Sequence, residues 1–279
     1  MNFENLGLSS QLLQSIKKLG FNTPTEIQIK SIPDIMTGKD IIGESATGSG
    51  KTLAFGCGII DQVKPKQGLQ ALVLTPTREL AEQVKESIQT LSSQSNLKIV
   101  PVYGGVSINH QIKDIPKAEV VIATPGRLLD HLERGTINLS KVQILVLDEA
   151  DRMLDMGFLD DVEQIIEECP TDRQTLFFSA TISKEIKRLA NKYMIKPVSV
   201  TAEKMVDPEK LKQVYYEIPK NMKLSLLVHL LKNEKSDLTM IFCNTRNTTD
   251  YVVKNLKANN IKAIAIHGGL TQTKRAKSI

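Results

Sequence analysis

The sequence predicts an α/β fold built on a parallel β-sheet with helices on both faces. Short runs of consecutive apolar residues recur along the chain, as in strands that are buried on both faces. Helical patterns separate these runs, and alternating strands and helices form right-handed crossovers between parallel strands. Aromatic residues make up only 4% of the 279 residues and Trp is absent, so the core must consist mainly of Ile, Leu and Val.

Five apolar runs in residues 1–202 are predicted to be core strands. Each run ends in polar, small or basic residues, and ligands bind at the carboxyl edge of open α/β sheets. The predicted helices between them include Arg78–Leu91, Gly126–Arg134 and Phe158–Glu168. The five runs are Asp40–Gly43, Ala71–Leu74, Val120–Ala123, Ile144–Leu147 and Thr175–Phe178.

The remaining residues predict a second, incomplete domain. Three further candidate strands follow, one starting near Gln213 and two at Met240–Phe242 and Ala263–Ile266. Residues 203–212 are polar, contain Pro208 and lack strand periodicity, which is typical of a linker. We therefore expect a first domain over 1–202, a linker over 203–212 and a partial second domain over 213–279.

Composition excludes several classes of protein. No apolar stretch approaches the ~20 residues of a membrane span, and the N-terminus lacks the features of a signal peptide. Three scattered cysteines, Cys57, Cys169 and Cys243, argue against a disulfide framework and a zinc site and indicate a reducing, cytoplasmic setting. The four histidines lack metal-ligand spacing. Residues 203–279 hold 14 Lys and Arg against 7 Asp and Glu, a balance that could attract phosphates but also fits a solvated lysine-rich surface.

A glycine-rich turn follows the first predicted strand and precedes a helix. Such turns let backbone N–H groups close around phosphate oxygens, and the helix N-terminus adds positive potential. In this arrangement Lys51 reaches the β- and γ-phosphates and the Thr52 hydroxyl binds Mg²⁺. The usual pattern G-x-x-x-x-G-K-[ST] has Gly in place of Ser45, and Ser is tolerated if its φ stays negative. The predicted nucleotide-binding residues are Ser45, Ala46, Thr47, Gly48, Ser49, Gly50, Lys51 and Thr52.

Two acidic residues end the most apolar strand. Parallel strands bring their carboxyl ends to one edge of the sheet, so we expect Asp148 and Glu149 to face the glycine-rich turn. Asp148 suits a Mg²⁺ contact, and Glu149 suits activation of an attacking water. The predicted catalytic residues are therefore Lys51, Asp148 and Glu149, with Thr52 and Asp148 as metal ligands.

The motif Asp148-Glu-Ala-Asp151 and those around it resemble the motifs of DEAD-box RNA helicases. Gly20–Gln28 is similar to the family's glutamine motif, placed here within residues 1–29, with Phe3 as its upstream aromatic. The other motifs follow in family order along the chain. They are Pro76–Ala81, Gly104-Gly105, Thr124–Arg127, Ser179–Thr181, Ile241–Arg246 and Gln272–Arg275.

The resemblance implies two RecA-like domains that bind ATP and RNA between them. It implies that Gln28 reads the adenine edge and that Phe21 and Phe3 contact the nucleotide, although Phe21 could instead be a core residue. It implies that Ser179 and Thr181 couple the ATP state to RNA strand separation, although they could equally cap a helix. Residues of three motifs would contact the RNA backbone largely independently of sequence. These residues are Pro76, Thr77, Arg78, Gly105, Thr124, Pro125, Gly126 and Arg127.

The resemblance also predicts limited turnover. The family's second domain continues past the position of Ile279 and supplies an arginine finger, which contributes roughly 10³–10⁵ in rate. We therefore expect an ATP-dependent RNA helicase that is truncated here, binds ATP with Mg²⁺ but hydrolyses it slowly. The alternatives are a non-catalytic ATP- and RNA-binding module and a DNA helicase of the same superfamily.

Overall fold

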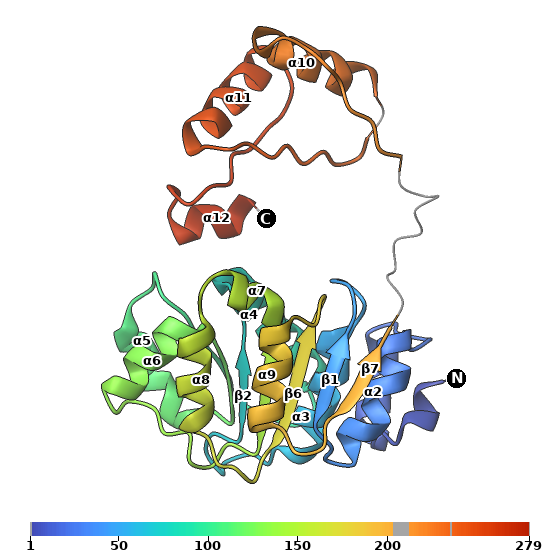
Figure 1. Cartoon of the computed structure of the whole chain (residues 1–279), viewed down its shortest axis with the longest axis vertical. Helices are drawn as coiled ribbons and strands as arrows, with labels where there is room; N and C mark the ends of the chain where they lie inside the picture. The colour runs from blue at the N-terminus through green and yellow to red at the C-terminus, as the bar shows by residue number, and fades with distance from the viewer. Residues whose placement is uncertain (1, 203–211, 235, 279) are drawn as a thin grey trace. The chain divides into compact units, whose positions relative to one another are not determined.

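The computed structural model of the chain describes residues 2–202, 212–234 and 236–278. The chain divides into two compact units, Met1–Asp207 and Pro208–Ile279 (Figure 1). The predicted linker, residues 203–212, lies outside the described residues except for Lys212.

The first unit contains a seven-stranded sheet in the order β3-β4-β2-β5-β6-β1-β7, and every pairing in it is parallel. This confirms the predicted fold class. The five predicted strands all form, within one or two residues of their expected ends. The strands are β1 (Ile41–Glu44), β2 (Ala71–Leu74), β3 (Ile99–Val102), β4 (Val120–Ala123), β5 (Ile144–Asp148), β6 (Gln174–Ser179) and β7 (Val198–Thr201).

The two strands that were not predicted, β3 and β7, form the edges of the sheet. β3 contains Pro101, which cannot donate to a ladder and is tolerated on an edge strand. β7 alternates polar and apolar residues because one of its faces is partly exposed. Neither strand therefore has the continuous apolar run that marks the central strands.

Helices cover both faces of the sheet and divide its side chains between two cores (Figure 1). Successive side chains of a strand point to opposite faces. In β5, Ile144 and Val146 join the core under the first group of helices, and Leu145 and Leu147 join the core under the second. The first group is η1 (Phe3–Leu6), α1 (Ser10–Lys18), α2 (Glu26–Met36), α3 (Lys51–Gln62) and α4 (Arg78–Leu91). The second group is η2 (Ile115–Lys117), α6 (Pro125–Glu133), α7 (Ala150–Asp155), α8 (Leu159–Glu167) and α9 (Lys184–Tyr193), while α5 (Ile108–Asp114) packs against β3 and η2.

The second unit contains α10 (Lys223–Asn233), α11 (Arg246–Ala258), α12 (Gln272–Ser278) and the short 3₁₀ turn η4 (Lys220–Met222). The three strands predicted here are wrong, because the described residues 212–234 and 236–278 contain no strand. Side chains of the predicted strands stay exposed, with Phe242 at 92% and Ile264 at 70%. A strand needs a partner for its N–H and C=O groups, and the described part of this unit offers none. Across the described residues of both units, no helix is long and apolar enough to span a bilayer.

A buried carboxylate joins the amino ends of three strands in the first unit. Asp40 precedes β1 and is 5% exposed. Its two oxygens accept the backbone N–H groups of Thr175 in β6 and of Ile195 before β7, each at 2.7 Å. The side chain thus satisfies two backbone donors that no ladder reaches.

Replacing Asp40 with Ala should lower the free energy of unfolding by about 2–4 kcal/mol, because each buried donor loses its acceptor. Denaturant unfolding of the whole chain measures this. The matched control is Asp34→Ala, which removes only an exposed ion pair with Lys39 and should change stability by less than about 1 kcal/mol. Equal effects of the two substitutions would contradict the role given to Asp40.

Candidate functional site

The glycine-rich turn forms a closed loop between β1 and α3. Gly48 and Gly50 have φ values of 80° and 93°, in the left-handed region that favours glycine. Ser45 is absent from the described non-glycine residues with positive φ, which confirms the condition for serine at this position. Its hydroxyl pairs with that of Ser49 at 2.8 Å in a buried contact. The loop is therefore preformed, with the N-terminus of α3 behind it.

The Lys51 side chain lies inside the same loop and is hydrogen-bonded to its carbonyl groups. The side chain is 6% exposed, and its ammonium donates to the carbonyls of Ser45 at 3.0 Å and Ala46 at 3.2 Å. A buried cation is tolerated only where it is paired or hydrogen-bonded, and these carbonyls supply partial compensation. An anion arriving at the loop would supply full compensation, so the arrangement favours a phosphate ligand.

Thr25, the N-cap of α2, and Gln28 within α2 both hydrogen-bond to the loop. The Thr25 hydroxyl donates to Ser49 O at 2.7 Å, and Gln28 Nε2 donates to Gly50 O at 3.0 Å. Gln28 Oε1 accepts the N–H of Thr25 at 2.9 Å. A Cβ on Gly50 would lie 2.3 Å from Gln28 Nε2 and would have to displace this amide, and the φ of 93° at Gly50 also favours glycine. The contact of Gln28 with adenine stays a prediction, whereas its hydrogen bond to the glycine-rich loop, Ser45–Gly50 (below, the phosphate loop, after its predicted ligand), is observed.

The two aromatic residues predicted at the nucleotide differ in exposure. Phe21 is 50% exposed, so the alternative that it is a core residue is wrong. Phe3 is 6% exposed and packs in the core beside the first group of helices. Its position gives Phe3 a packing role, and its contact with a nucleotide stays a prediction.

Asp148 lies at the end of β5 and is 3% exposed. Burial raises the pKa of its carboxyl to about 6, while the positive charge of Lys51 opposes this rise. The carboxylate and the ammonium are therefore close enough to interact, as expected if both face a bound triphosphate. Asp148 Oδ1 accepts the N–H of Glu149 at 3.1 Å.

Glu149 occupies the N-cap of α7 with φ 53° and ψ 50°, a left-handed conformation that is uncommon for a residue other than glycine. Such strain is found most often where a side chain must be aimed precisely at a ligand. Its only described ion pair is a 3.6 Å contact with the exposed Arg152. Glu149 is thus held by its backbone more than by side-chain partners.

The residues predicted to hold a cation fit magnesium only in part. Asp148 and Thr52 offer hard oxygen donors, which Mg²⁺ prefers. The described residues contain no group of three or more His, Cys, Asp and Glu side chains able to hold a metal alone. Mg²⁺ usually keeps several waters and binds together with substrate phosphates, so this sparse donor set suits a nucleotide-bound ion.

Asp151 connects the end of β5 to the end of β6. Its Oδ2 accepts both the N–H and the hydroxyl of Thr181, at 2.9 and 3.0 Å, and its own N–H donates to Ser179 Oγ at 3.0 Å. Burial raises the pKa of Asp151, but these hydroxyl contacts outweigh burial and the pKa is lowered overall. Sequence reasoning missed this role of Asp151, as it missed that of Thr25, although both residues lie inside the quoted motifs.

Arginine and glycine residues from three motifs meet at the same edge of the sheet. A Cβ on Gly105 would lie 1.8 Å from Arg78 Nη1, so the guanidinium packs directly on this glycine. A Cβ on Gly104 would lie 3.4 Å from Arg78 Nη2 and 3.9 Å from Arg127 Nη2. The structure therefore brings Arg78, Gly105 and Arg127 together, as the resemblance implies.

The flanking residues of these motifs shape the helix starts. Thr77 caps α4 by accepting the N–H of Leu80 at 3.3 Å, and Pro76 before it is buried. Thr124 is the N-cap of α6 without a side-chain cap, and Pro125 is buried at the first helical position. Gly126 is exposed with open space around it. Gly126 is thus the exposed member of this group, while Thr77 and Thr124 are half-buried.

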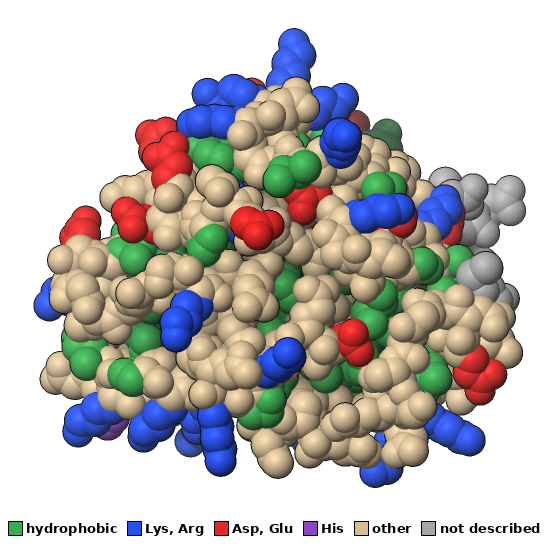
Figure 2. Space-filling view, turned by 90° about the horizontal axis from the view of Figure 1, so that it is seen from below, with side chains coloured by type: hydrophobic (Ala, Val, Ile, Leu, Met, Phe, Trp, Pro, Cys, Tyr) green, Lys and Arg blue, Asp and Glu red, His purple; other side chains and the backbone are tan. Residues whose placement is uncertain are grey.

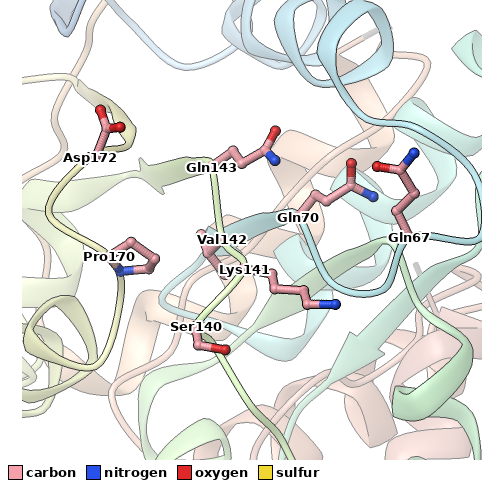
Figure 3. A pocket seen from close by; sticks show the side chains of 8 residues that line it. All are labelled: Gln67, Gln70, Ser140, Lys141, Val142, Gln143, Pro170 and Asp172. Carbon is pink, nitrogen blue, oxygen red and sulfur yellow. The ribbon is translucent and has the colours of Figure 1, made fainter.

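A hollow of about 790 Å³ lies at the opposite edge of the sheet, before β2, β5 and β6 (Figure 3). Seen from below, this side of the molecule carries charges of both signs, and some of the Lys and Arg side chains gather along its rim (Figure 2). The amide of Gln70, which lines the hollow, is already bonded to the N–H and C=O of Lys64. This hollow is separate from the predicted site.

The DEAD/DEAH box helicase family model matches residues 25–189, and the helicase conserved C-terminal domain matches residues 222–279. The chain therefore belongs to the DEAD/DEAH box helicase family.

Individual relatives agree with this membership. A probable ATP-dependent RNA helicase from Methanocaldococcus jannaschii is 44% identical over all of this chain and 75% of its own length. The ATP-dependent RNA helicase CshA of Limosilactobacillus reuteri is 43% identical over 99% of this chain and 56% of its own length. The crystal structure of a DEAD box protein from Methanococcus jannaschii covers 99% of this chain with a TM-score of 0.71 and 44% identity, and 76% of that chain is matched. The chain thus spans little more than half of the bacterial relative.

Asp148→Asn should stabilise the free protein at pH 7.5. Because the folded pKa is about 6 and the unfolded value is near 3.9, the ionised carboxyl lowers stability above pH 6, by up to about 3 kcal/mol. The gain from Asn should shrink as the pH falls and vanish near pH 4. Urea unfolding in buffer without nucleotide or metal measures it.

The matched control for this experiment is Asp151→Asn, since the pKa of Asp151 is lowered. Its ionised form stabilises the fold, so Asn at this position should destabilise the protein at pH 7.5. An Asp148→Asn protein that is less stable than the wild type at pH 7.5 would contradict the burial argument.

Proposed function

We propose that the protein is an ATP-dependent RNA helicase, whose first unit binds ATP and RNA at one edge of the sheet. The observation that carries the proposal is that two buried charged side chains, Lys51 in the glycine-rich loop and Asp148 at the end of β5, lie at the carboxyl edge of one parallel sheet, where the charge of Lys51 lowers the pKa of Asp148. Both residues are buried, and neither is fully compensated by the protein. A triphosphate with its cation would compensate both charges.

In this proposal the phosphate loop binds the β- and γ-phosphates through its backbone N–H groups and Lys51. Thr25 and Gln28 keep the loop in shape, because they fix the carbonyls of Ser49 and Gly50. Phe21, half exposed beside α1, is available to stack on the base. Gln28 would then give the site its preference for adenine, as the resemblance implies.

Hydrolysis is assigned to the acidic pair. Glu149 orients the attacking water and accepts its proton as the oxygen attacks the γ-phosphorus and the bond to the β-phosphate oxygen breaks. Asp148 and Thr52 would hold Mg²⁺, which neutralises charge on the phosphate oxygens when bound. The left-handed backbone at Glu149 fixes where this side chain leaves the start of α7.

RNA binding is assigned to the arginine and glycine cluster. In this proposal Arg78, Arg127 and Gly105 contact the sugar-phosphate backbone of an RNA strand and position it without reading its sequence. The affinity for RNA should therefore depend steeply on salt and weakly on sequence. The contacts of Asp151 with Ser179 and Thr181 tie the acidic pair to β6. We propose that this link couples the state of the nucleotide to RNA strand separation.

We also propose that a polypeptide of residues 1–279 hydrolyses ATP slowly. The described residues of the second unit form no sheet, and their apolar side chains stay exposed. Such a unit is poorly suited to close on the nucleotide and stabilise the charge that develops in the transition state.

A cytoplasmic setting is proposed from the free cysteines, of which Cys57 and Cys169 are buried.

Lys51→Ala should weaken ATP binding about tenfold or more, since a charge-assisted contact is lost. Glu149→Gln should leave ATP affinity within about twofold but lower turnover about 10²–10⁴-fold. Nucleotide titration and a single-turnover assay measure the two effects, and Lys141→Ala at the opposite edge is the control. Normal hydrolysis by Glu149→Gln would remove Glu149 from the mechanism.

Residues 1–279 should show an RNA-stimulated ATPase rate roughly 10³-fold or more below that of the Methanocaldococcus jannaschii relative, because the described part of the second unit forms no sheet. Steady-state ATPase with and without RNA measures this. The full-length Methanocaldococcus jannaschii relative, assayed in parallel, provides the reference. Comparable RNA-stimulated rates for the two proteins would show that the second unit is sufficient as it stands.

A further inference from the structure

The guanidinium of Arg127 is held in place before any nucleic acid binds. Its Nη1 donates to Gln111 Oε1 and to Val106 O, each at 3.2 Å. Its Nε lies 3.6 Å from Asp130 Oδ2. Only 15% of the side chain is exposed, which is little for a residue at a surface cluster.

The Gln111 side chain has one orientation that satisfies all its neighbours. Gln111 is 6% exposed. Its Nε2 donates to the carbonyl of Tyr103 at 2.9 Å, so its Oε1 must be the atom that faces Arg127. The same Oε1 lies 3.0 Å from His131 Nε2. One buried amide thus links the segment before Gly104 to the first turn of α6.

His131 acts as a fixed donor to this amide. The ring is fully buried, and because Gln111 Oε1 can only accept, His131 Nε2 must carry a proton. His131 Nδ1 lies 2.7 Å from the Thr136 hydroxyl. Burial and the charge of Arg127 lower the pKa of His131, so the ring is neutral near pH 7 and adds no charge to the cluster.

We propose that Gln111 is a positioning residue for nucleic-acid binding, which holds Arg127 ready for a phosphate and is itself oriented by His131. The inference rests on the proposed RNA-binding function. A long side chain that is ordered in advance loses less entropy when its ligand binds.

The group that orients Arg127 is the side-chain amide of Gln111, which carries no charge. A carboxylate at the same place would orient Arg127 but would also neutralise it, whereas an amide orients the guanidinium and leaves its charge for a phosphate. The nearest carboxylate, Asp130, is already paired with Arg134 Nε at 2.5 Å, compared with 3.6 Å from Arg127. Asp130 therefore compensates the charge of Arg127 less than it compensates that of Arg134.

The test is a double-mutant cycle on the whole chain, measured as binding of a uridine oligonucleotide by fluorescence anisotropy at several salt concentrations. Arg127→Ala should weaken binding about fivefold at 0.1 M salt and reduce the salt slope by about 0.7, as expected for one lost phosphate contact on a single strand. Gln111→Met keeps the buried volume and should weaken binding about two- to threefold. The double variant should bind no more weakly than Arg127→Ala alone.

Three further variants separate positioning from stability. His131→Leu removes the donor to Gln111 and should behave like Gln111→Met, whereas His131→Gln can still donate and should bind like the wild type. Gln143→Met at the opposite, exposed edge of the sheet is the matched control and should have no effect.

The outcomes distinguish the positioning inference from the proposed function. If Gln111→Met weakens binding equally with and without Arg127, or not at all while Arg127→Ala does, Gln111 does not act through Arg127 and the inference is overturned. If Arg127→Ala itself leaves affinity and salt slope unchanged, the assignment of this face to RNA is wrong, and the inference falls with it.

Discussion

The parallel register of β1, β6 and β5 is the constraint on which the site depends. Glu44 at the end of β1 is level with Ser179 of β6, and Asp148 of β5 is level with Phe178 of β6. The ladder continues one step further, since the N–H of Ser45 donates to Ser179 O at 2.9 Å. The glycine-rich loop after β1, Ser179–Thr181 after β6, and the acidic pair Asp148 and Glu149 after β5 therefore leave the sheet at one level. A slip of one residue would exchange the two faces of a strand and separate these groups.

Three features of the candidate site lower the stability of the folded protein. Asp148 is buried and its pKa is raised to about 6, Lys51 is buried against carbonyls, and Glu149 has a left-handed backbone. Each of these features is unfavourable in the free protein, and under the proposed function a bound triphosphate would offset the cost of the two buried charges. The surrounding parallel sheet, with apolar cores on both faces, supplies the stability that tolerates them.

Local patterns explain which features could be predicted from the sequence. The central strands and the phosphate loop were recognisable because continuous apolar runs and a glycine-rich turn are local signals. The edge strand β3 was missed because Pro101 interrupts its pattern, and the strands near Phe242 were wrongly predicted because an apolar run does not reveal whether a partner strand exists. The contacts of Gln111 with Arg127 and His131 join residues 16 and 20 positions apart, and no local spacing indicates them.

The most direct test of the account is a crystal structure with a non-hydrolysable ATP analogue and Mn²⁺, whose anomalous scattering locates the metal. The account predicts the β- and γ-phosphates on the backbone N–H groups of the loop, with Lys51 turned from the carbonyls of Ser45 and Ala46 toward the phosphates. It places Mn²⁺ between these phosphates, Thr52 and Asp148. A nucleotide bound elsewhere, or a metal remote from Asp148 with Lys51 still bonded to those carbonyls, would contradict it.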